Sequence, residues 1–400
     1  MKKILILFLS VTLGFNSFSQ DVDYDDILGG NLNTITTAVP FLLISPDSKS
    51  GAMGDVGVAT TPDASSMHWN PAKLAFTKDD IGISVSIVPW LRELVPDINL
   101  QYIGGYYKLN DNEAIGYELR YFSLGDITFT DGSGQVIGQY KPNEMAFGTA
   151  YSRKLSRDFS IAISARYIYS NLTGGQTAGG TETIAGQSIA ADVSTYYTKP
   201  ITIADKKSDI SFGMNISNIG NKISYTETIT RDFIPINLRL GTDVTTEIDD
   251  YNKMSFAIDF NKLLVPSPPI YDDGILIAGK DPEVSVVSGM FQSFGDAPGE
   301  IDETGNPVPG SIFKEEMREI NISAGFEYWY ANQFALRAGY FHEHDTKGGR
   351  KYLTFGSGVK YNVFALDFSY LISTSNIGGT NPLANTMRFT LVFDLGAMGS

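Results

Sequence analysis

The chain contains no cysteine, which excludes disulfide bonds, thiol catalysis and a lipid anchor on an N-terminal cysteine. It contains only three histidines, so few pairings of a histidine with a nucleophile are available. No apolar run after the N-terminus is long enough to form a membrane-spanning helix. Positive charge is scarce as well, and the formal net charge of −15 argues against nucleic acid as a partner.

Residues 1–19 are predicted to be a removable signal peptide. Met1–Lys3 is a short basic region, Ile4–Phe15 is apolar, and Ser17–Ser19 is a small-x-small site that favours cleavage before Gln20. An exported chain without a membrane-spanning helix is soluble in the periplasm, secreted, or a membrane β-barrel.

Strict alternation of apolar and polar residues recurs along the rest of the chain, for example over Asp80–Pro89 and Met387–Asp394. Successive side chains of a strand point to opposite faces. In a soluble all-β protein the apolar face would pack on a second sheet, whereas in a membrane barrel it faces lipid. The length and number of the segments favour an all-β, transmembrane antiparallel barrel in the outer membrane.

Fourteen strands are predicted, an even number as is usual in single-chain bacterial barrels. The predicted strands cover 80–90, 98–108, 114–124, 143–154, 158–170, 187–198, 208–217, 233–244, 252–262, 318–330, 333–343, 350–361, 362–373 and 385–395. Short turns and long loops alternate, which places the short turns and the start of the barrel in the periplasm. A predicted loop at 199–207 is longer than its periplasmic position would suggest.

Charged residues of both signs fall on the polar face of the predicted strands, which is the lumen face. These residues are Glu118, Arg120, Arg166, Asp192, Arg239, Asp259, Glu327, Arg337, Asp367, Arg388 and Asp394. Such charges can pair with one another, so we expect a filled lumen rather than an open aqueous pore. Ordinary structural ion pairs, without a role in transport, explain them most simply.

The segment 20–79 lacks the alternation and is predicted to plug the lumen or to lie at its periplasmic mouth, before a barrel over 80–396. Its central residues are Trp69, Asn70, Pro71 and Ala72, where Asn-Pro is a turn signal. Together with the glycine-rich stretch Gly51–Ala59, this segment resembles the start of FadL-type transporters of hydrophobic compounds. Those proteins are fourteen-stranded barrels with an N-terminal hatch.

The long loop 263–317 is predicted to contain a short amphipathic helix on the outer side of the membrane. Asp281 suits the N-cap, Pro282 the first helical position and Glu283 the first turn. The apolar face of this helix consists of Val284, Val287, Met290, Phe291 and Phe294. This face either packs over the barrel's own mouth or binds another protein, since a Met/Phe surface suits adaptable binding.

Several segments together resemble the PorV (LptO) family of FadL-like barrels in the type IX secretion system. They are Asn70–Ala75, Asn218–Gly220 with Lys222–Tyr225, and Val284–Phe294 with Lys314–Glu319. The resemblance implies a non-enzymatic adaptor and shuttle without catalytic residues, cofactor or metal. It implies binding to a giant translocon barrel (SprA or Sov) and to cargo proteins with C-terminal signal domains. Cargo would pass to a sortase-containing attachment complex, and the barrel wall would face outer-membrane lipid.

Two other functions stay open at this stage. A FadL-like transporter of long-chain fatty acids or other hydrophobic compounds would need an apolar pocket that continues past the hatch, which the lumen charges disfavour. An outer-membrane enzyme would need a nucleophile with a histidine partner. The run His342–Asp345 could suggest a metal site but lacks a third placed ligand, so a solvated loop tip is the simpler interpretation, and His68 is expected to pack inside the plug.

Overall fold

The computed structural model describes residues 32–91, 97–130, 133–175, 177–178, 181–226, 231–302, 308–374 and 385–396. The predicted signal peptide and the last four residues lie outside these ranges. The description below concerns the compact unit that begins at Asn33.

Fourteen antiparallel strands form a closed barrel, in which each strand pairs with its neighbours along the chain and the last pairs with the first. The strands are β1 (Ile81–Pro89), β2 (Ile98–Asn110), β3 (Glu113–Leu124), β6 (Asn143–Lys154), β7 (Phe159–Asn171), β10 (Gly186–Ile203), β11 (Lys206–Gly220), β12 (Asn237–Glu247), β13 (Asn252–Leu263), β16 (Asn321–Tyr330), β17 (Phe334–His342), β18 (Lys351–Tyr361), β19 (Phe364–Ser373) and β20 (Met387–Asp394). The predicted fold class and strand count are therefore confirmed, and most strand boundaries agree closely.

The predicted loop at 199–207 was wrong. β10 continues to Ile203, β11 begins at Lys206, and the two strands pair as a hairpin up to the turn. Ala204 and Asp205 both have positive φ, 48° and 63°, as a two-residue hairpin turn requires. The connection is thus as short as a periplasmic turn should be, and the two strands are longer than their neighbours.

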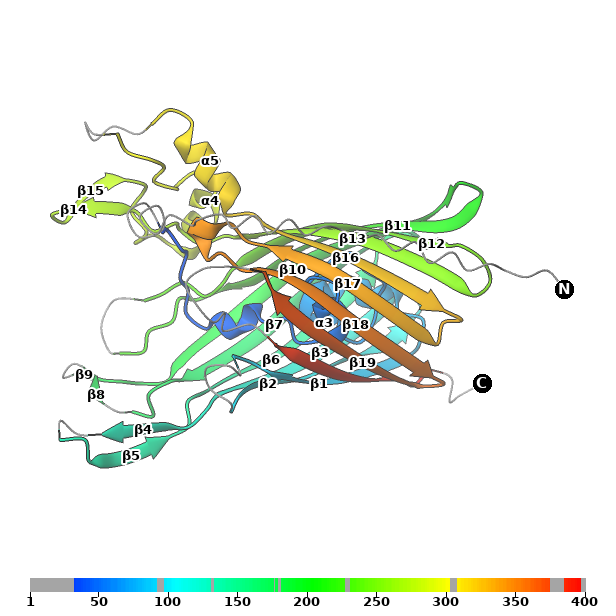
Figure 1. The fold of residues 1–400 in the computed structure, drawn as a ribbon, viewed down its shortest axis with the longest axis horizontal. Helices are drawn as coiled ribbons and strands as arrows, with labels where there is room; N and C mark the ends of the chain where they lie inside the picture. The colour runs from blue at the N-terminus through cyan, green and yellow to red at the C-terminus, as the bar shows by residue number, and fades with distance from the viewer. Residues whose placement is uncertain are drawn as a thin grey trace, which may run out of the picture. The chain divides into compact units, whose positions relative to one another are not determined.

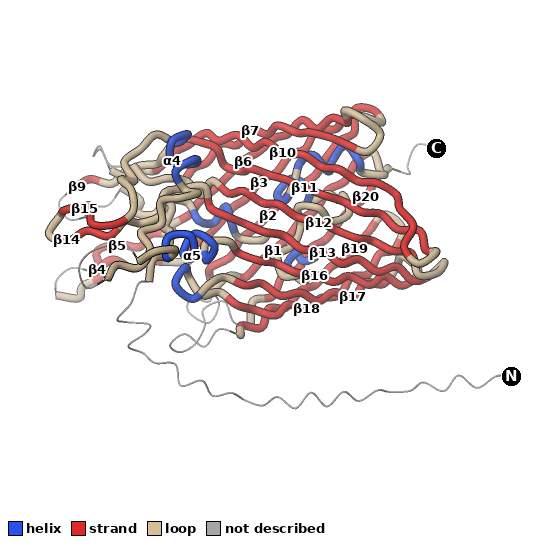
Figure 2. The backbone as a smooth tube through the Cα atoms, turned by 90° about the horizontal axis from the view of Figure 1, so that it is seen from above, coloured by secondary structure: helices blue, strands red, loops and turns tan. Residues whose placement is uncertain are grey.

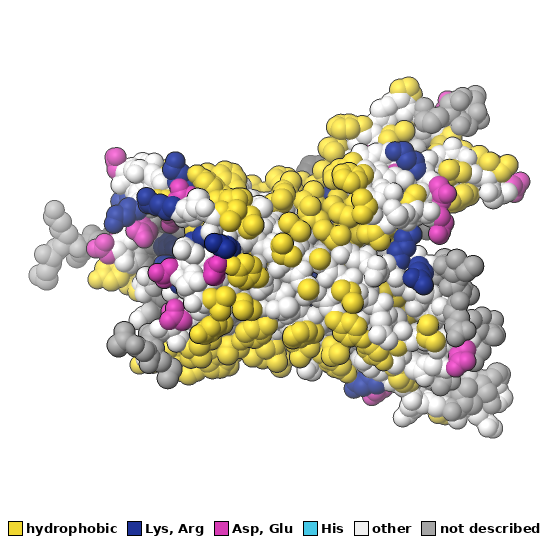
Figure 3. Space-filling model, turned by 180° about the vertical axis from the view of Figure 1, so that it is seen from behind, with side chains coloured by type: hydrophobic (Ala, Val, Ile, Leu, Met, Phe, Trp, Pro, Cys, Tyr) yellow, Lys and Arg dark blue, Asp and Glu magenta, His cyan; other side chains and the backbone are white. Residues whose placement is uncertain are grey.

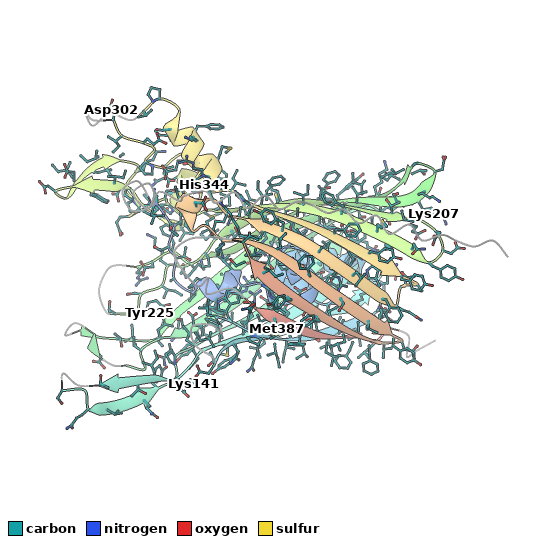
Figure 4. All side chains as sticks on the ribbon, viewed as in Figure 1. Lys141, Lys207, Tyr225, Asp302, His344 and Met387 are labelled. Atoms are coloured by element: carbon teal, nitrogen blue, oxygen red, sulfur yellow. The ribbon has the colours of Figure 1, made fainter. Side chains whose placement is uncertain are left out.

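The barrel wall is apolar outside and polar inside. Ile87, Ile163, Ile189, Phe256 and Leu366 are each more than half exposed on the outer face, and Figure 3 shows apolar side chains covering the wall while charged side chains gather toward its two ends. This is the reverse of a soluble barrel and the arrangement of an outer-membrane barrel. Short turns lie at one end of the wall, near Lys207, and long loops lie at the other, near Tyr225 and His344 (Figure 4).

The segment before β1 fills the lumen (Figures 1 and 2). It contains four short helices, η1 (Pro40–Leu43), α2 (Ser48–Gly51), α3 (Ser66–Trp69) and η2 (Pro71–Phe76). Asn33 lies at the long-loop end, where its N–H donates to Thr346 O (3.0 Å) and its side chain to Pro268 O (3.1 Å). Asp80 lies at the short-turn end, where its carbonyl accepts from Lys108 N (2.8 Å). The segment therefore crosses the whole lumen, rather than lying only at the periplasmic mouth.

The long loops carry structure of their own. Three hairpins, β4–β5 (Ile127–Thr130 with Val136–Tyr140), β8–β9 (Thr177–Ala178 with Thr181–Glu182) and β14–β15 (Ile270–Asp272 with Ile275–Ala278), rise from this end. Two helices, α4 (Val286–Gln292) and α5 (Ser311–Arg318), belong to the loop between β13 and β16, and a short turn of helix, η3 (Asp345–Lys347), follows β17. In the part of the chain that the structure describes, no helix is long and apolar enough to cross a membrane.

Glycines on the lumen side of the wall let the plug lie against the strand backbone. A Cβ atom at Gly339 would come within 2.1 Å of the backbone of Met53 and Gly54, and one at Gly213 would come within 2.1 Å of Val58 O. Real Cβ atoms do not approach so closely, so these wall positions require glycine for contact with the plug.

We expect Gly339→Ala to displace the plug and to destabilise the barrel by about 1–3 kcal/mol, the usual cost of overpacking. The measurement is thermal unfolding in detergent, followed by loss of the β-sheet circular dichroism signal. Gly138→Ala is the matched control, because no atom lies within 4 Å of a Cβ at that position. Equal melting temperatures for the two variants would contradict the close packing.

Candidate functional site: the sealed lumen and the outer-loop module

A layer of paired charges closes the middle of the lumen. The Arg166 guanidinium lies between Glu118 (2.8 Å) and Asp192 (3.0 Å), and Arg120 contacts Glu118 at 2.9 Å. Arg120 also contacts His68 of the plug, so His68 packs inside, as expected. All of these side chains are buried, and their pairing confirms the expected ion pairs of a filled lumen.

Ten of the eleven predicted lumen charges are buried. A second group joins Arg337 to Glu327 (2.7 Å) and Asp367 (2.5 Å). Asp394 differs, because it is only half-buried and pairs with Lys360 at 2.6 Å.

The Asn-Pro-Ala sequence locks the plug to the wall. Asn70 caps η2 by accepting from Ala72 N (3.0 Å), and its amide donates to Val58 O and Thr195 O, both at 2.9 Å. Pro71 follows at the first position of the helix, where its missing N–H costs nothing. The carbonyl of Ala72 accepts from two wall hydroxyls, those of Ser152 and Ser160. These residues satisfy buried backbone groups, which assigns them a structural role.

Trp69 contacts both the plug and the barrel wall. Its indole N–H donates to Asp47 (2.6 Å), and its carbonyl accepts from Asn215 on β11 (3.0 Å). Arg239 lies over the indole ring at 4.8 Å, a cation–π contact. The ring also lies directly on Gly57, where a Cβ would be 2.2 Å from the indole. Trp69 thus joins two parts of the plug to the wall.

On the long-loop side of the charged layer lies a cluster of buried apolar side chains, which we call the apolar chamber. The N-terminal strap, residues 38–44, packs inside it. Phe41 and Leu42 are buried there against Leu100, Phe122 and Ile168 of the wall. The Leu42 carbonyl accepts from Arg120 (2.9 Å), which ties the strap to the charged layer. The backbone of Val39 has φ 48°, a costly conformation for a β-branched residue. Packing in the chamber therefore holds the strap in a strained conformation.

Replacing Arg166 by Met should destabilise the barrel by about 3–5 kcal/mol, because Asp192 would keep a buried charge without an ion-pair partner and Glu118 would keep only Arg120. The double variant Arg166→Met, Asp192→Asn should recover much of this loss, because Glu118 still pairs with Arg120. The stability of both variants is measured by the temperature at which the barrel loses its folded mobility on gels. A double variant as unstable as the single variant would show that the pairing does not set the stability.

We call residues 263–317 the outer-loop module. Its helix α4 begins at Val286 with Ser285 as N-cap, and the Ser285 hydroxyl accepts from Ser288 N (3.2 Å). The predicted start at Asp281 with Pro282 was therefore wrong. Asp281 instead accepts from Glu283 N in a local turn (2.8 Å), and a hydroxyl cap just before the apolar residues starts the helix.

The predicted apolar face of α4 divides into two sides. Met290 packs against the apolar chamber cluster, and Val284 is half-buried. Val287, Phe291 and Phe294 point outward and are 60%, 77% and 55% exposed. The structure thus brings Val287, Phe291 and Phe294 together as an open surface.

Helix α5 turns its charged side inward. Glu315, Glu316 and the following Glu319 are buried, whereas Phe313 is 69% and Met317 48% exposed. An amphipathic helix on a soluble surface has the opposite orientation. The apolar side chains of α5 therefore add to the open surface of α4 in a module that projects from the barrel rim (Figure 1).

Two buried lysines hold α5 in this orientation. Lys262 at the end of β13 contacts Glu316 (3.0 Å) and Glu319 (2.6 Å). Lys347 of η3 contacts Glu315 (2.6 Å) and Glu319 (3.0 Å). Burial raises the pKa of Glu319, but the two ammonium groups more than offset this effect and hold the pKa below its usual value. The module is thus fixed to the rim by charge.

Asp296 lies beside this cluster and is buried. Burial, together with the neighbouring Glu316 and Glu319 carboxylates, raises the pKa of Asp296 to about 6. One carboxylate oxygen accepts from Ser267 N (3.2 Å), and the other has no hydrogen-bond partner among the described residues. Protonation of Asp296 therefore removes an unfavourable buried charge.

We expect the module to become more stable as the pH falls from about 7.5 to 5.5. The folded pKa of Asp296 lies above its ordinary value, so its contribution grows as pH falls through about 6. Glu319 opposes this trend only below its ordinary pKa. Amide hydrogen exchange at Ala297 and Gly299, corrected for intrinsic rates, should show protection that rises severalfold. If protection rises with falling pH by the same factor in Asp296→Asn, the effect belongs to another titrating group.

The run His342–Asp345 is occupied by local contacts. Glu343 pairs with Arg350 (2.8 Å), Asp345 with Lys351 (2.7 Å), and His344 caps η3. Across the described ranges, no group of three or more metal-ligating side chains occurs.

Sequence reasoning missed the hairpin β14–β15 and helix α5. Asp273-Gly274 between Asp272 and Ile275 is a strong hairpin signal, and it was available in the sequence. The orientation of α5 had no such signal, because Lys262 and Lys347 are distant from it along the chain.

The chain is similar in sequence to one known family and in structure to several solved barrels. The chain matches the family described as type IX secretion system protein PorV over residues 29–270, and no curated protein matches it in sequence. Similar solved structures include the toluene transporter TbuX of Ralstonia pickettii (11% identity, 87% of this chain and 97% of that chain, TM-score 0.46). They also include a FadL homologue of Pseudomonas aeruginosa (10% identity, 92% of this chain and 100% of that chain, TM-score 0.43). A further one is the toluene transporter TodX of Pseudomonas putida (10% identity, 91% of this chain and 98% of that chain, TM-score 0.45). Because the family match spans more than half of its length, the chain belongs to the PorV family of type IX secretion system proteins.

Proposed function

We propose that this outer-membrane barrel is a non-enzymatic adaptor, which binds its partners through the outer-loop module. The family match supports a place in type IX secretion. Its partners there would be the translocon barrel and cargo proteins that carry C-terminal signal domains. Cargo would then pass to the sortase-containing attachment complex.

The orientation of α4 and α5 carries this proposal. Both helices bury part of their surface on the barrel rim while large apolar side chains face outward. Apolar surfaces of this kind on a projecting module mark sites of protein interaction. Aromatic side chains such as Phe291 and Phe313 have the large contact area that binding hot spots need.

The closed lumen supports an adaptor rather than a channel. The plug crosses the barrel, and paired charges fill the layer beneath the strap. A role that depends on the outer loops needs no passage through the barrel.

A transporter of hydrophobic compounds is the second candidate, and the apolar chamber around Phe41 favours it. Transport would require the strap to leave and the charged layer below to open. Binding of a radiolabelled fatty acid by the purified chain, with release into the lumen of proteoliposomes, would support this candidate over the adaptor.

The first experiment is a pull-down of the affinity-tagged chain from its own outer membrane in mild detergent, with mass spectrometry of the bound proteins. Recovery of a very large barrel, or of secreted proteins that retain their C-terminal signal domain, supports the adaptor. A barrel recovered alone with bound fatty acid overturns it.

The triple variant Val287→Ser, Phe291→Ser, Phe294→Ser should lower the yield of bound partner at least tenfold. The reason is that loss of a hot-spot cluster costs about 2 kcal/mol or more, and about 1.4 kcal/mol corresponds to a factor of ten. Val136→Ser with Ile184→Ser is the matched control, since these side chains are 64% and 44% exposed on other outer loops. Undiminished binding by the triple variant, in quantitative mass spectrometry, would remove α4 from the interface.

A further inference from the structure

The hairpin β14–β15 stands apart from the barrel sheet. It is a two-stranded sheet with its own turn, Asp273-Gly274, in which both residues have positive φ, 46° and 79°. This is the backbone of a tight two-residue turn. An isolated two-stranded hairpin is marginally stable in water and is stabilised by further strands or by packing.

Strand β15 is open on both faces. Ile275, Leu276 and Ile277 are 68%, 40% and 39% exposed, and consecutive residues of a strand point to opposite faces. A surface strand normally buries one face and exposes polar side chains on the other. Three consecutive aliphatic residues fit a strand that is covered on both faces, and these side chains of β15 are exposed.

The outer edge of β15 has backbone groups without a partner among the described residues. Asp272 and Ile275 flank the two-residue turn and form the hydrogen-bonded pair, so the next pair, Tyr271 with Leu276, is not bonded. The N–H and C=O of Leu276 therefore point away from β14. Among the described residues, no backbone hydrogen bond from outside the hairpin reaches Leu276.

The chain protects one other protruding edge, that of β10. β10 extends beyond its last pair with β7, Tyr197 with Phe159. On the extension, Pro200 lies at an outward-pointing position and has no N–H to offer, and Lys199 is exposed beside it. Proline and lysine are common means of blocking strand addition. β15 has neither residue, and its register shift, which leaves Ile277 without a register partner, comes only after Leu276.

We propose that the edge of β15 binds an extended segment of a partner protein, which adds a strand beside Leu276. The proposal rests on the proposed adaptor function and assigns a second binding surface to the module. Backbone hydrogen bonds would supply affinity, and alternate aliphatic side chains of the segment would cover Ile275 and Ile277. Lipid is a poor occupant, because it cannot satisfy the backbone groups of Leu276.

The charges around the hairpin indicate the composition of the partner segment that would bind there. Asp272 and Asp273 at the turn and Asp281 and Glu283 just after the hairpin are exposed, against the single cation Lys280 in this stretch. An acidic surround favours a partner with positive charge. The expected segment is therefore aliphatic in its centre and basic at the end that meets the turn.

The test uses the full-length chain in its own outer membrane. Leu276→Pro removes the outward N–H without removing a ladder bond, and it should lower the yield of bound partner at least fivefold. Tyr271→Pro is the matched control, because it removes the equivalent outward N–H on the opposite edge. Leu276→Val keeps the N–H and an aliphatic side chain, so it should bind like the unmodified chain.

Equal losses in Leu276→Pro and Tyr271→Pro would overturn the proposal, because they would show damage to the hairpin rather than to one edge. Undiminished binding by Leu276→Pro would also overturn it. The triple variant Val287→Ser, Phe291→Ser, Phe294→Ser is compared with Leu276→Pro. If the triple variant loses the partner while Leu276→Pro retains it, the adaptor function is supported and strand addition at β15 is contradicted. If the unmodified chain binds no partner, the adaptor function itself fails.

A second measurement identifies the occupant. The chain has no cysteine, so Leu276→Cys provides a unique thiol for a photoreactive maleimide. We expect adducts on one short segment, aliphatic and basic, of the same protein that Val287→Cys labels from α4. An adduct with a second copy of this chain, or adducts scattered over many partner sites, would overturn the proposal.

Discussion

The buried ion pair that places Arg166 between Glu118 and Asp192 is the interaction on which the rest of the structure depends. A closed barrel of fourteen strands encloses more space than its own side chains fill, so a further segment must enter it. Buried charges add little net stability, but a missing partner costs much more. The lumen therefore accepts only a plug whose polar groups match, as when Gly57 N donates to Asp259 (2.8 Å).

Under the proposed adaptor function, this constraint leaves the binding surfaces outside the lumen. A plug that is bonded at both ends of the lumen and in its middle cannot leave without exposing several charges at once. The wall itself is an apolar surface for lipid. The long loops and the short turns are exposed at the two ends of the barrel, and the outer-loop module, with a hairpin and two helices, is the loop that carries large apolar side chains on its surface.

The fold could be predicted from the sequence because strand alternation is local. The same is true of the lumen charges, which fall on the face that the alternation defines. The hairpin turn at Ala204–Asp205 was missed because neither residue is a glycine, although both adopt positive φ. The start of α4 was misplaced because the local preference of Asp281-Pro282 lost to the cap at Ser285. These errors arise where backbone conformation overrides residue preference.

The candidate site was only partly predictable for a different reason. Sequence patterns assign the apolar side of a helix to the interior, and α5 reverses that assignment because Lys262 and Lys347 compensate its carboxylates. Such pairing depends on contacts across the barrel rim, which one sequence does not reveal. The arrangement also has a physical advantage for an adaptor. Charge anchors the module, so its large apolar side chains stay available in a fixed geometry, and a partner can bind them without a prior ordering cost.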